Sequence, residues 1–231
     1  MSRTDLLVVN SEIIGEVVRR VSALSPEAVL MVSTNPLDHM TLLAAEVSGF
    51  PRRRVMGQAG VLDTARFAYF IAEASSVDVL DVEALVLGSH GEGMVPVPSQ
   101  CLVAGKPLLE VLDAVEIAEV VQRTRDGGDQ IVSLLRTGGA YFAPASATVK
   151  MVRAVLEDSG EVMPVCAWVT GQYGISDVYL GVPAALGADG VERILELALT
   201  ADELNALKQA ASSVIEKAAE LHRLHSIVKQ G

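Results

Sequence analysis

The sequence places one histidine in a setting that suits a carrier of protons. His90 stands in the run Gly88-Ser89-His90-Gly91, directly after the apolar stretch Ala84 to Leu87. An imidazole titrates near neutral pH, and neighbouring glycines let the backbone approach a ligand closely. A glycine-rich turn with an incidental histidine would have the same pattern, so His90 taken alone favours neither interpretation.

Two charged residues upstream could complete such a site. Asp63 and Arg66 lie one helical step apart in a stretch with helical apolar spacing. Asp63 could orient the imidazole and raise its proton affinity, or it could simply cap the helix. Arg66 could bind a carboxylate through paired hydrogen bonds, or form a surface salt bridge with Asp63. With His90 they would supply most of what a 2-hydroxy-acid dehydrogenase needs at its reacting carbon.

A third candidate group follows the first apolar strand of the chain. Asn35-Pro36 comes directly after the apolar run Ala28 to Ser33. In open α/β proteins, ligands bind at the carboxyl edge of the sheet, where an amide at this position would point. An ordinary turn would need the same two residues.

The hydrophobic pattern predicts the elements that position these groups. It predicts a helix over 5–24 and then a βαβ unit, which consists of a buried strand over 28–33, a helix over 37–47 capped by Gly49 and a strand over 54–57. Beyond it, the pattern predicts helices over 62–74, 115–135 (interrupted by Gly127-Gly128), 146–156 and 201–228, and strands over 84–87, 94–103, 163–170 and 178–182. This order predicts an α/β unit followed by an α+β lobe.

Composition excludes several classes of function. The chain has 231 residues, 50% of them hydrophobic, and a formal net charge of −11 with scattered Lys and Arg, which argues against a nucleic-acid partner. Its apolar stretches fall short of the ~20 residues that a membrane span requires, and its N-terminus lacks an apolar signal core. We therefore expect a cytoplasmic protein that binds neither nucleic acid nor a membrane.

The cysteines and the remaining histidines indicate no metal centre. Cys101 and Cys166 stand in apolar surroundings without metal-like spacing, which is typical of buried, reduced thiols. His222 and His225 lie on the predicted C-terminal helix with no third ligand nearby, and we expect them on the surface. No metal site is expected.

Several motifs, taken in order, resemble the malate dehydrogenases of the lactate-dehydrogenase-like type. The resemblance rests on Val32 to Asp38, Gly57 to Asp63, Arg66 and Gly88 to Gly91, and it continues through Thr170 to Gly174. It covers essentially the whole chain and is highly specific. It implies reversible oxidation of malate to oxaloacetate with NAD as cofactor, and an assembly of two or four copies.

On the substrate side, the resemblance assigns a role to each matching residue. His90 would give and take the proton, with Asp63 as its partner. Arg66 would bind the terminal carboxylate of the substrate, and Arg3 would polarise the carbonyl from a mobile loop. Asn35 would contact both the substrate and the cofactor.

On the cofactor side, the resemblance is less complete. Asn10, Ser33 and Thr34 would face the nicotinamide, but the sequence contains no G-x-G-x-x-G turn. The chain opens at Met1 within what the family uses as its active-site loop, so the loop's earlier arginine is absent. That arginine selects a dicarboxylic substrate, which leaves lactate or another 2-hydroxy acid as the alternative to malate. Ser89 also departs from the usual residue, and we expect little effect from it.

The resemblance therefore implies a shortened enzyme of two parts. Residues 1–60 would be the C-terminal remnant of the NAD-binding domain, an α/β remnant of a Rossmann-type parallel sheet that keeps its last two strands. Residues 61–231 would be the α+β catalytic domain. Strand 28–33 would then expose an unpaired edge, through which the chain would associate or aggregate. Three explanations stay open: a truncated dehydrogenase with impaired activity, half of a split enzyme whose partner chain supplies the nucleotide half, or a non-catalytic oligomerisation module.

Overall fold

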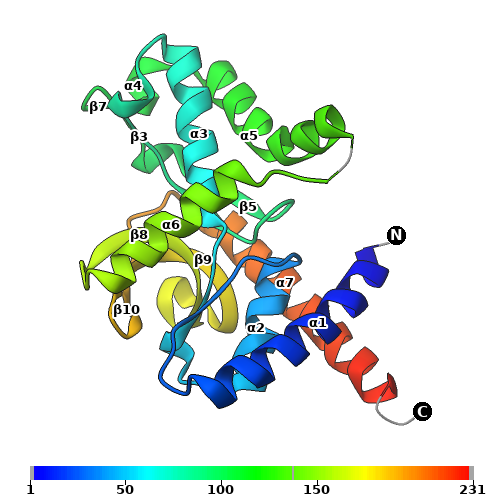
Figure 1. Cartoon of the computed structure of the whole chain (residues 1–231). Coiled ribbons are helices and arrows are strands. Elements are labelled where there is room, and N and C mark those ends of the chain that lie inside the picture. Colours follow the sequence, from blue (N-terminus) through cyan, green and yellow to red (C-terminus); the bar gives the residue numbers. More distant parts are fainter. Residues whose placement is uncertain (1–2, 137, 229–231) are drawn as a thin grey trace.

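The structure, a computed structural model, describes the backbone of residues 3–136 and 138–228, and their side chains except at positions 3–6, 8 and 219–228. Figure 1 shows the elements in order along the chain. Its helices are α1 (Arg3–Leu24), α2 (Leu37–Ser48), α3 (Gly60–Ser75), α4 (Leu108–Val111), α5 (Ala114–Leu135), α6 (Phe142–Leu156) and α7 (Ala201–Val228). Its strands are β1 (Leu30–Val32), β2 (Val55–Gly57), β3 (Val82–Glu83), β4 (Val86–Gly88), β5 (Met94–Pro96), β6 (Leu102–Val103), β7 (Lys106–Pro107), β8 (Glu161–Thr170), β9 (Ser176–Gly187) and β10 (Gly190–Ile194).

One mixed sheet runs through most of the described chain. Its strand order is β1-β2-β8-β9-β4-β5, with β10 paired to β9. β1 and β2 are parallel and are connected by α2, which confirms the predicted βαβ unit. The other pairings in this sheet are antiparallel. A small antiparallel sheet, β3-β6-β7, lies beside it.

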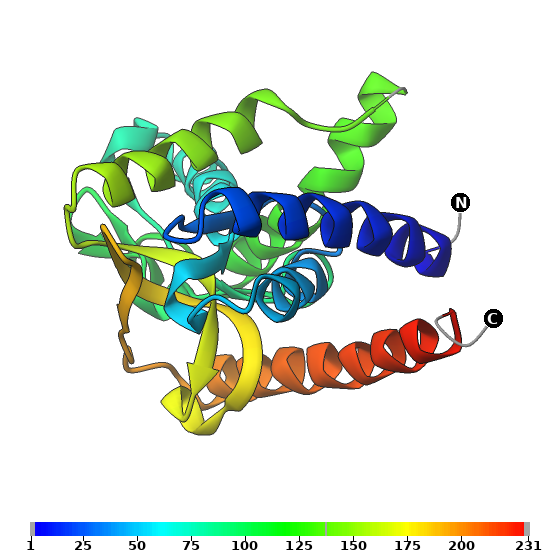
Figure 2. The same ribbon diagram turned by 60° about the horizontal axis from the view of Figure 1, so that its bottom comes forward.

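The long β8–β9 hairpin separates two apolar clusters. Cys166 and Tyr179 pack with α1 and α2, whereas Met163, Val165 and Ala167 pack with α6 and α7. This division follows from the alternation of side chains along a strand. Figure 2 shows α1 and α7 extending in the same direction, with α2 between them.

A third apolar cluster places α3 against the small sheet. Phe67 and Ile71 of α3 are fully buried among residues of β4, β5, β6 and α5. Cys101 belongs to this cluster, and both cysteines are buried and free, as predicted. α3 therefore reaches from the main sheet, where it begins, into this second layer (Figure 1).

Two predicted elements were wrong in detail. The predicted strand 94–103 is two strands in different sheets, β5 and β6, because prolines interrupt it and Pro98–Gln100 forms a 3₁₀ turn. The predicted break in the helix at Gly127-Gly128 does not occur, and α5 is continuous through both glycines. Isolated glycines weaken a helix by only about 1 kcal/mol each, and packing on α3 outweighs that loss.

β1 forms one end of the main sheet. Among the described residues its only strand partner is β2, so its other edge has no ladder partner. Helix α1, which packs on α2, exposes an apolar stripe, with Ile13 and Val17 about half exposed. The strand edge that the sequence predicts is therefore present, whereas association through it stays a prediction.

Candidate functional site

The His90 loop is a tight turn between two paired strands. β4 ends at Gly88, whose φ of 82° suits a glycine, and a Cβ there would lie 2.4 Å from the carbonyl oxygen of Gly93. The Ser89 N–H donates to the Gly93 carbonyl at 3.0 Å, and the Met94 N–H donates to Gly91 at 3.1 Å. The turn thus presents His90 from a braced backbone.

Asp63 of α3 holds the imidazole of His90. Their Nδ1 and Oδ2 atoms are 2.8 Å apart, the Asp63 side chain is only 3% exposed, and that of His90 is 21% exposed. Asp63 is not the helix cap, because α3 begins at Gly60 and Ala59 occupies the cap position. A carboxylate at Nδ1 favours the tautomer with the proton on that atom, which leaves Nε2 to exchange a proton with a substrate.

The surroundings of His90 raise its pKa. Burial on its own lowers the pKa, but the hydrogen bond and charge of Asp63 and the charge of Asp38 together outweigh that effect. The positive charge of Arg66 opposes them. The imidazole therefore keeps its proton at a higher pH than a free histidine would, which suits a group that must work in both protonation states.

Arg66 lies on the same helix and shares the carboxylate. Its Nη1 atom is 3.3 Å from Oδ1 of Asp63 and donates to the Thr124 carbonyl, also at 3.3 Å. The pairing with Asp63 that the spacing suggests is therefore present, but it is partly buried and not on the surface, since the Arg66 side chain is only 13% exposed. One carboxylate thus orients both the proton carrier and the cation.

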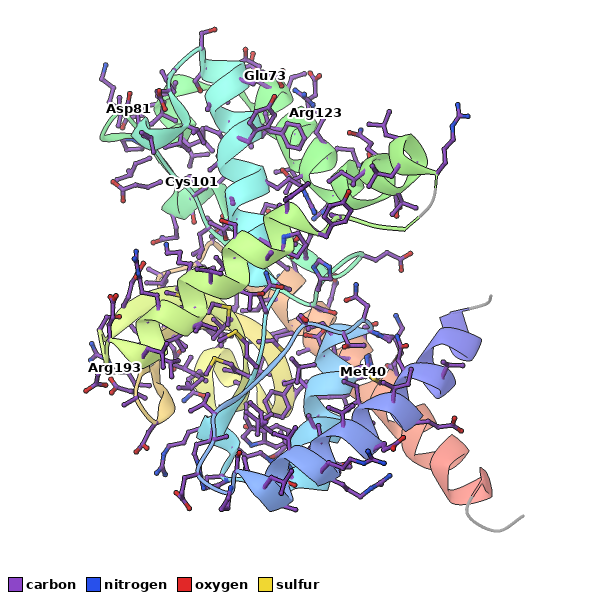
Figure 3. All side chains as sticks on the ribbon, in the orientation of Figure 1. Met40, Glu73, Asp81, Cys101, Arg123 and Arg193 are labelled. Carbon is purple, nitrogen blue, oxygen red and sulfur yellow. The ribbon has the colours of Figure 1, made fainter. Side chains whose placement is uncertain are left out.

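Helix α5 supplies the space that Arg66 occupies. A Cβ at Gly127 would lie 2.6 Å from Cδ of Arg66, whereas one at the neighbouring Gly128 would contact nothing within 4 Å. Figure 3 shows Glu73 and Arg123, which form an ion pair between α3 and α5 further along the same two helices. Sequence reasoning missed Gly127 and Thr124, because nothing local marks the approach of another helix.

The residues expected on the cofactor side gather at the carboxyl end of β1. Nδ2 of Asn10, on α1, donates to the Asn35 carbonyl at 2.6 Å, and the Asn35 residue is exposed. Ser33 and Thr34 stand between β1 and Asn35, with Ser33 exposed. Arg3 is the first residue of α1, but its side chain lies outside the described ones.

One bond connects these two groups of residues, and sequence reasoning missed it. Asp38, in the first turn of α2, accepts a hydrogen bond of 2.6 Å from Oγ of Ser89. Asp38 follows Asn35 closely in sequence, and Ser89 precedes His90. The departure at Ser89 from the family pattern therefore has a structural partner that the sequence did not indicate.

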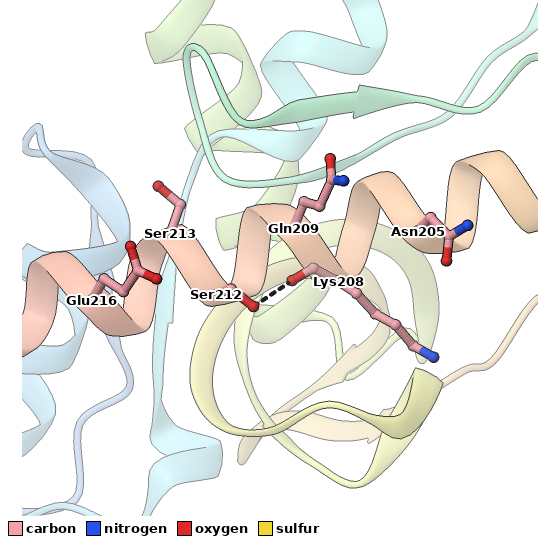
Figure 4. Close-up of a pocket in the computed structure, with 6 residues that line it drawn as sticks. All are labelled: Asn205, Lys208, Gln209, Ser212, Ser213 and Glu216. Carbon is pink, nitrogen blue, oxygen red and sulfur yellow. Dashed lines mark hydrogen bonds between the residues drawn. The ribbon is translucent and has the colours of Figure 1, made fainter.

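Two hollows in the described part of the chain do not have His90 in their lining. One of about 440 Å³ runs along α7 and is lined by polar side chains such as Lys208 and Ser212 (Figure 4). The other, of about 280 Å³, lies between α2, α7 and the β8–β9 hairpin and includes His39 and Trp168. None of the predicted site residues lines either of them.

The described part of the chain gives two further findings. It contains no group of three or more His, Cys, Asp or Glu side chains arranged to hold a metal ion. Within that same part, no helix combines the length and the apolar character that crossing a membrane requires. The side chains of His222 and His225 lie outside it.

The fold and the site define a class of protein. A histidine held by a buried aspartate, with an arginine beside it and amides at the carboxyl end of a parallel strand, suits proton transfer on an anionic substrate. Two family descriptions match the chain: the lactate/malate dehydrogenase NAD binding domain over residues 1–57, and the alpha/beta C-terminal domain over residues 60–223. The chain belongs to the lactate/malate dehydrogenase family of oxidoreductases.

Individual relatives agree with this assignment. A malate dehydrogenase of Roseiflexus castenholzii is 46% identical over 224 residues, which cover 97% of this chain and 72% of the relative. The solved structure of malate dehydrogenase from Salinibacter ruber is 45% identical, with a TM-score of 0.94 over 97% of this chain and 73% of that one. A Cryptosporidium parvum lactate dehydrogenase in complex with lactic acid and NAD is 41% identical, with a TM-score of 0.92 over 95% of this chain and 71% of that one.

Proposed function

We propose that the chain oxidises malate to oxaloacetate with NAD, and that His90 takes the hydroxyl proton. The observation that carries this proposal is the network in which Asp63 binds both His90 and Arg66. A base and an anion-binding cation held by one buried carboxylate have a fixed separation. That geometry is what a 2-hydroxy acid needs, because its reacting hydroxyl is next to a carboxylate.

The chain's own residues would divide the work on the substrate. Nε2 of His90 accepts the hydroxyl proton during oxidation and returns it during reduction. Arg66 binds the carboxylate beside the reacting carbon, and the Asn35 amide orients the oxygen that becomes the carbonyl. Arg3 is proposed to contact that same oxygen, on the strength of the family resemblance alone.

NAD, when bound, supplies the acceptor for the hydride that leaves the reacting carbon. The fit of the described residues to the nicotinamide is supported by the polar groups of Ser33, Thr34 and Asn35 at the end of β1, of which Ser33 and Asn35 are exposed and Thr34 is partly buried. The side chain of Asn10 donates to the backbone carbonyl of Asn35. The side-chain amide of Asn35 is thereby left for ligands. These four residues are the proposed cofactor contacts.

We propose malate and not lactate as the substrate because of the relatives. The relative from Roseiflexus castenholzii is a malate dehydrogenase, whereas the similar solved structures include both a malate and a lactate dehydrogenase. The proposed division of the chain is residues 1–60, a remnant of the NAD-binding sheet with its last two strands, and residues 61–231, the catalytic part.

We also propose that identical copies of the chain assemble. Exposed Phe142 and Leu156 on α6, at 83% and 80%, support such an assembly.

One observation favours a second candidate function, in which the site needs another polypeptide. The free edge of β1 and the apolar stripe of α1 lie beside the proposed cofactor contacts. A chain that adds a strand at the free edge of β1 could complete the nucleotide site.

The deciding experiment is malate-dependent reduction of NAD by the purified 231-residue chain, followed by absorbance. Turnover with malate that exceeds turnover with lactate, and that His90→Asn removes, is the expected result. Turnover with lactate but not with malate would overturn the substrate. Absence of turnover with both substrates at saturating NAD would overturn the proposal for the chain alone and favour the partner-dependent candidate.

A further inference from the structure

Asp38 is a buried acid that the proposed chemistry does not use. Its side chain lies in the first turn of α2, and the residue is only 3% exposed. Oδ2 accepts the 2.6 Å hydrogen bond from Ser89, and Oδ1 accepts a bond of 3.2 Å from Sγ of Cys166. Both oxygens are therefore engaged, each by a residue distant in sequence, which is how a buried carboxyl is made tolerable.

The partner of Asp38 stands at the base of the His90 turn. The turn is braced internally by the bond from Ser89 to the Gly93 carbonyl, and a Cβ on Gly93 would lie only 2.9 Å from that of Ser89. A unit stiffened in this way moves as one body, so a single outside bond can set its orientation. The Ser89 hydroxyl makes that bond, and its partner is on the helix that begins directly after Asn35.

We propose that Asp38 is a positioning residue that, through Ser89, fixes the His90 turn against the start of α2 and so sets the proton carrier relative to Asn35. The geometry carries this inference, because Asp63 orients the ring from α3 but does not connect it to α2. The two carboxyls thus hold His90 from different helices. The inference rests on the proposed function for its meaning, since it assumes that His90 and Asn35 act on one substrate.

The charges around His90 agree with this arrangement. Asp63 and Arg66 face it from α3, and Asp38 acts from α2 to raise its pKa. Asp38 itself has a raised pKa because it is buried, while the bonds from Ser89 and Cys166 and the charges of His39 and His90 lower it. Loss of the Ser89 hydroxyl would therefore favour the neutral form of Asp38 and weaken its support of protonated His90.

The test compares three variants by the titration of His90 and by amide hydrogen exchange in residues 88–94. Ser89→Ala removes the bond, and Asp38→Asn keeps an acceptor for Ser89 but removes the charge. Ser99→Ala is the matched control, because Ser99 donates to Glu203 at the same distance, 2.6 Å, in another part of the chain. NMR of histidine-labelled protein, with the His90 signal assigned from His90→Asn, follows the imidazole directly.

We expect Ser89→Ala to lower the pKa of His90 and to speed exchange in the turn. Asp38→Asn should lower the pKa with slower exchange than Ser89→Ala, and Ser99→Ala should change neither. An unchanged titration and unchanged exchange in Ser89→Ala would overturn the inference, whatever the fate of Asp38→Asn. Neither measurement needs turnover, so failure of the chain to oxidise malate would refute the proposed function and leave this result standing.

Discussion

Two regions differ in how far described residues pair or cover their groups. One is the corner around His90, made of His90, Asp63 and Arg66, and the other is the region around β1 and α1. In the first, the buried Asp63 engages two partners, and α3, α5 and the β4–β5 turn enclose the group. In the second, a strand edge has no ladder partner and α1 leaves apolar side chains in water. The residues proposed for proton transfer and anion binding are thus held by several described elements, whereas the proposed cofactor contacts lie at the end of a strand that has one described ladder partner.

His90→Asn should give the largest effect and tests whether the enclosed corner does the chemistry. The amide can still bond to Asp63 but cannot carry a proton, so kcat should fall about 10²–10⁴-fold with little loss of stability. Steady-state kinetics with malate and thermal unfolding would measure the two. A variant that keeps the wild-type kcat would remove His90 from its proposed role.

Arg66→Ala tests the anion-binding half of the same corner. Loss of a charge-assisted contact costs roughly 1.5–3 kcal/mol, so KM for malate should rise about 10- to 100-fold, with a smaller change in kcat. A fall in kcat at unchanged KM would show instead that Arg66 supports His90 and does not hold the substrate.

Gly127→Ala tests whether the packing of α5 against α3 sets the position of Arg66 and so affects substrate binding. The added methyl group would collide with Cδ of Arg66, and the displacement should raise KM about 10-fold. Gly128→Ala is the matched control. Its methyl group contacts nothing within 4 Å, so it should leave KM unchanged and stabilise the helix by about 0.5–1 kcal/mol. Equal kinetics in the two variants would contradict the assigned packing role.

Asp63→Asn tests, through the pH dependence of malate oxidation, whether Asp63 controls the protonation of His90. Because Asp63 raises the pKa of His90, its neutralisation should lower that pKa, and malate oxidation, which needs neutral His90, should then persist to lower pH. The pH profile of kcat/KM measures the shift. A profile that stays in place, or that moves to higher pH, would show that Asp63 does not raise the pKa of His90.

Charged substitutions on the exposed apolar stripe of α1 should have the smallest effect on the site around His90. Glutamate at both Ile13 and Val17 should reduce self-association in sedimentation and change stability by about 0.5 kcal/mol or less, because both residues are half exposed. Leu80→Glu is the control, since Leu80 is 90% exposed on a separate turn. A wild-type chain that sediments as a monomer, with slow amide exchange in residues 30–32, would contradict the prediction of association through this edge.

Much of the fold follows from local patterns. The apolar spacing of 5–24, 62–74 and 201–228 predicts α1, α3 and α7, and Gly49, with a φ of 65°, ends α2 as predicted. The strand at 94–103 could not be predicted in the same way, because its apolar residues continue across a change of sheet. Pro96 and Pro98 mark the break locally, and the pairing of β5 with β4 and of β6 with β3 shows that its two halves belong to different sheets.

Residue types and their order along the chain determined which groups could do chemistry: an imidazole between glycines, a carboxylate, a cation and an amide after a strand. The tertiary structure decided how those groups are held. Asp63 reaches His90 across 27 positions, Arg66 reaches the Thr124 carbonyl across 58, and Asp38 reaches Ser89 across 51. Contacts over such separations depend on how whole elements pack, and local spacing carries no information about that packing.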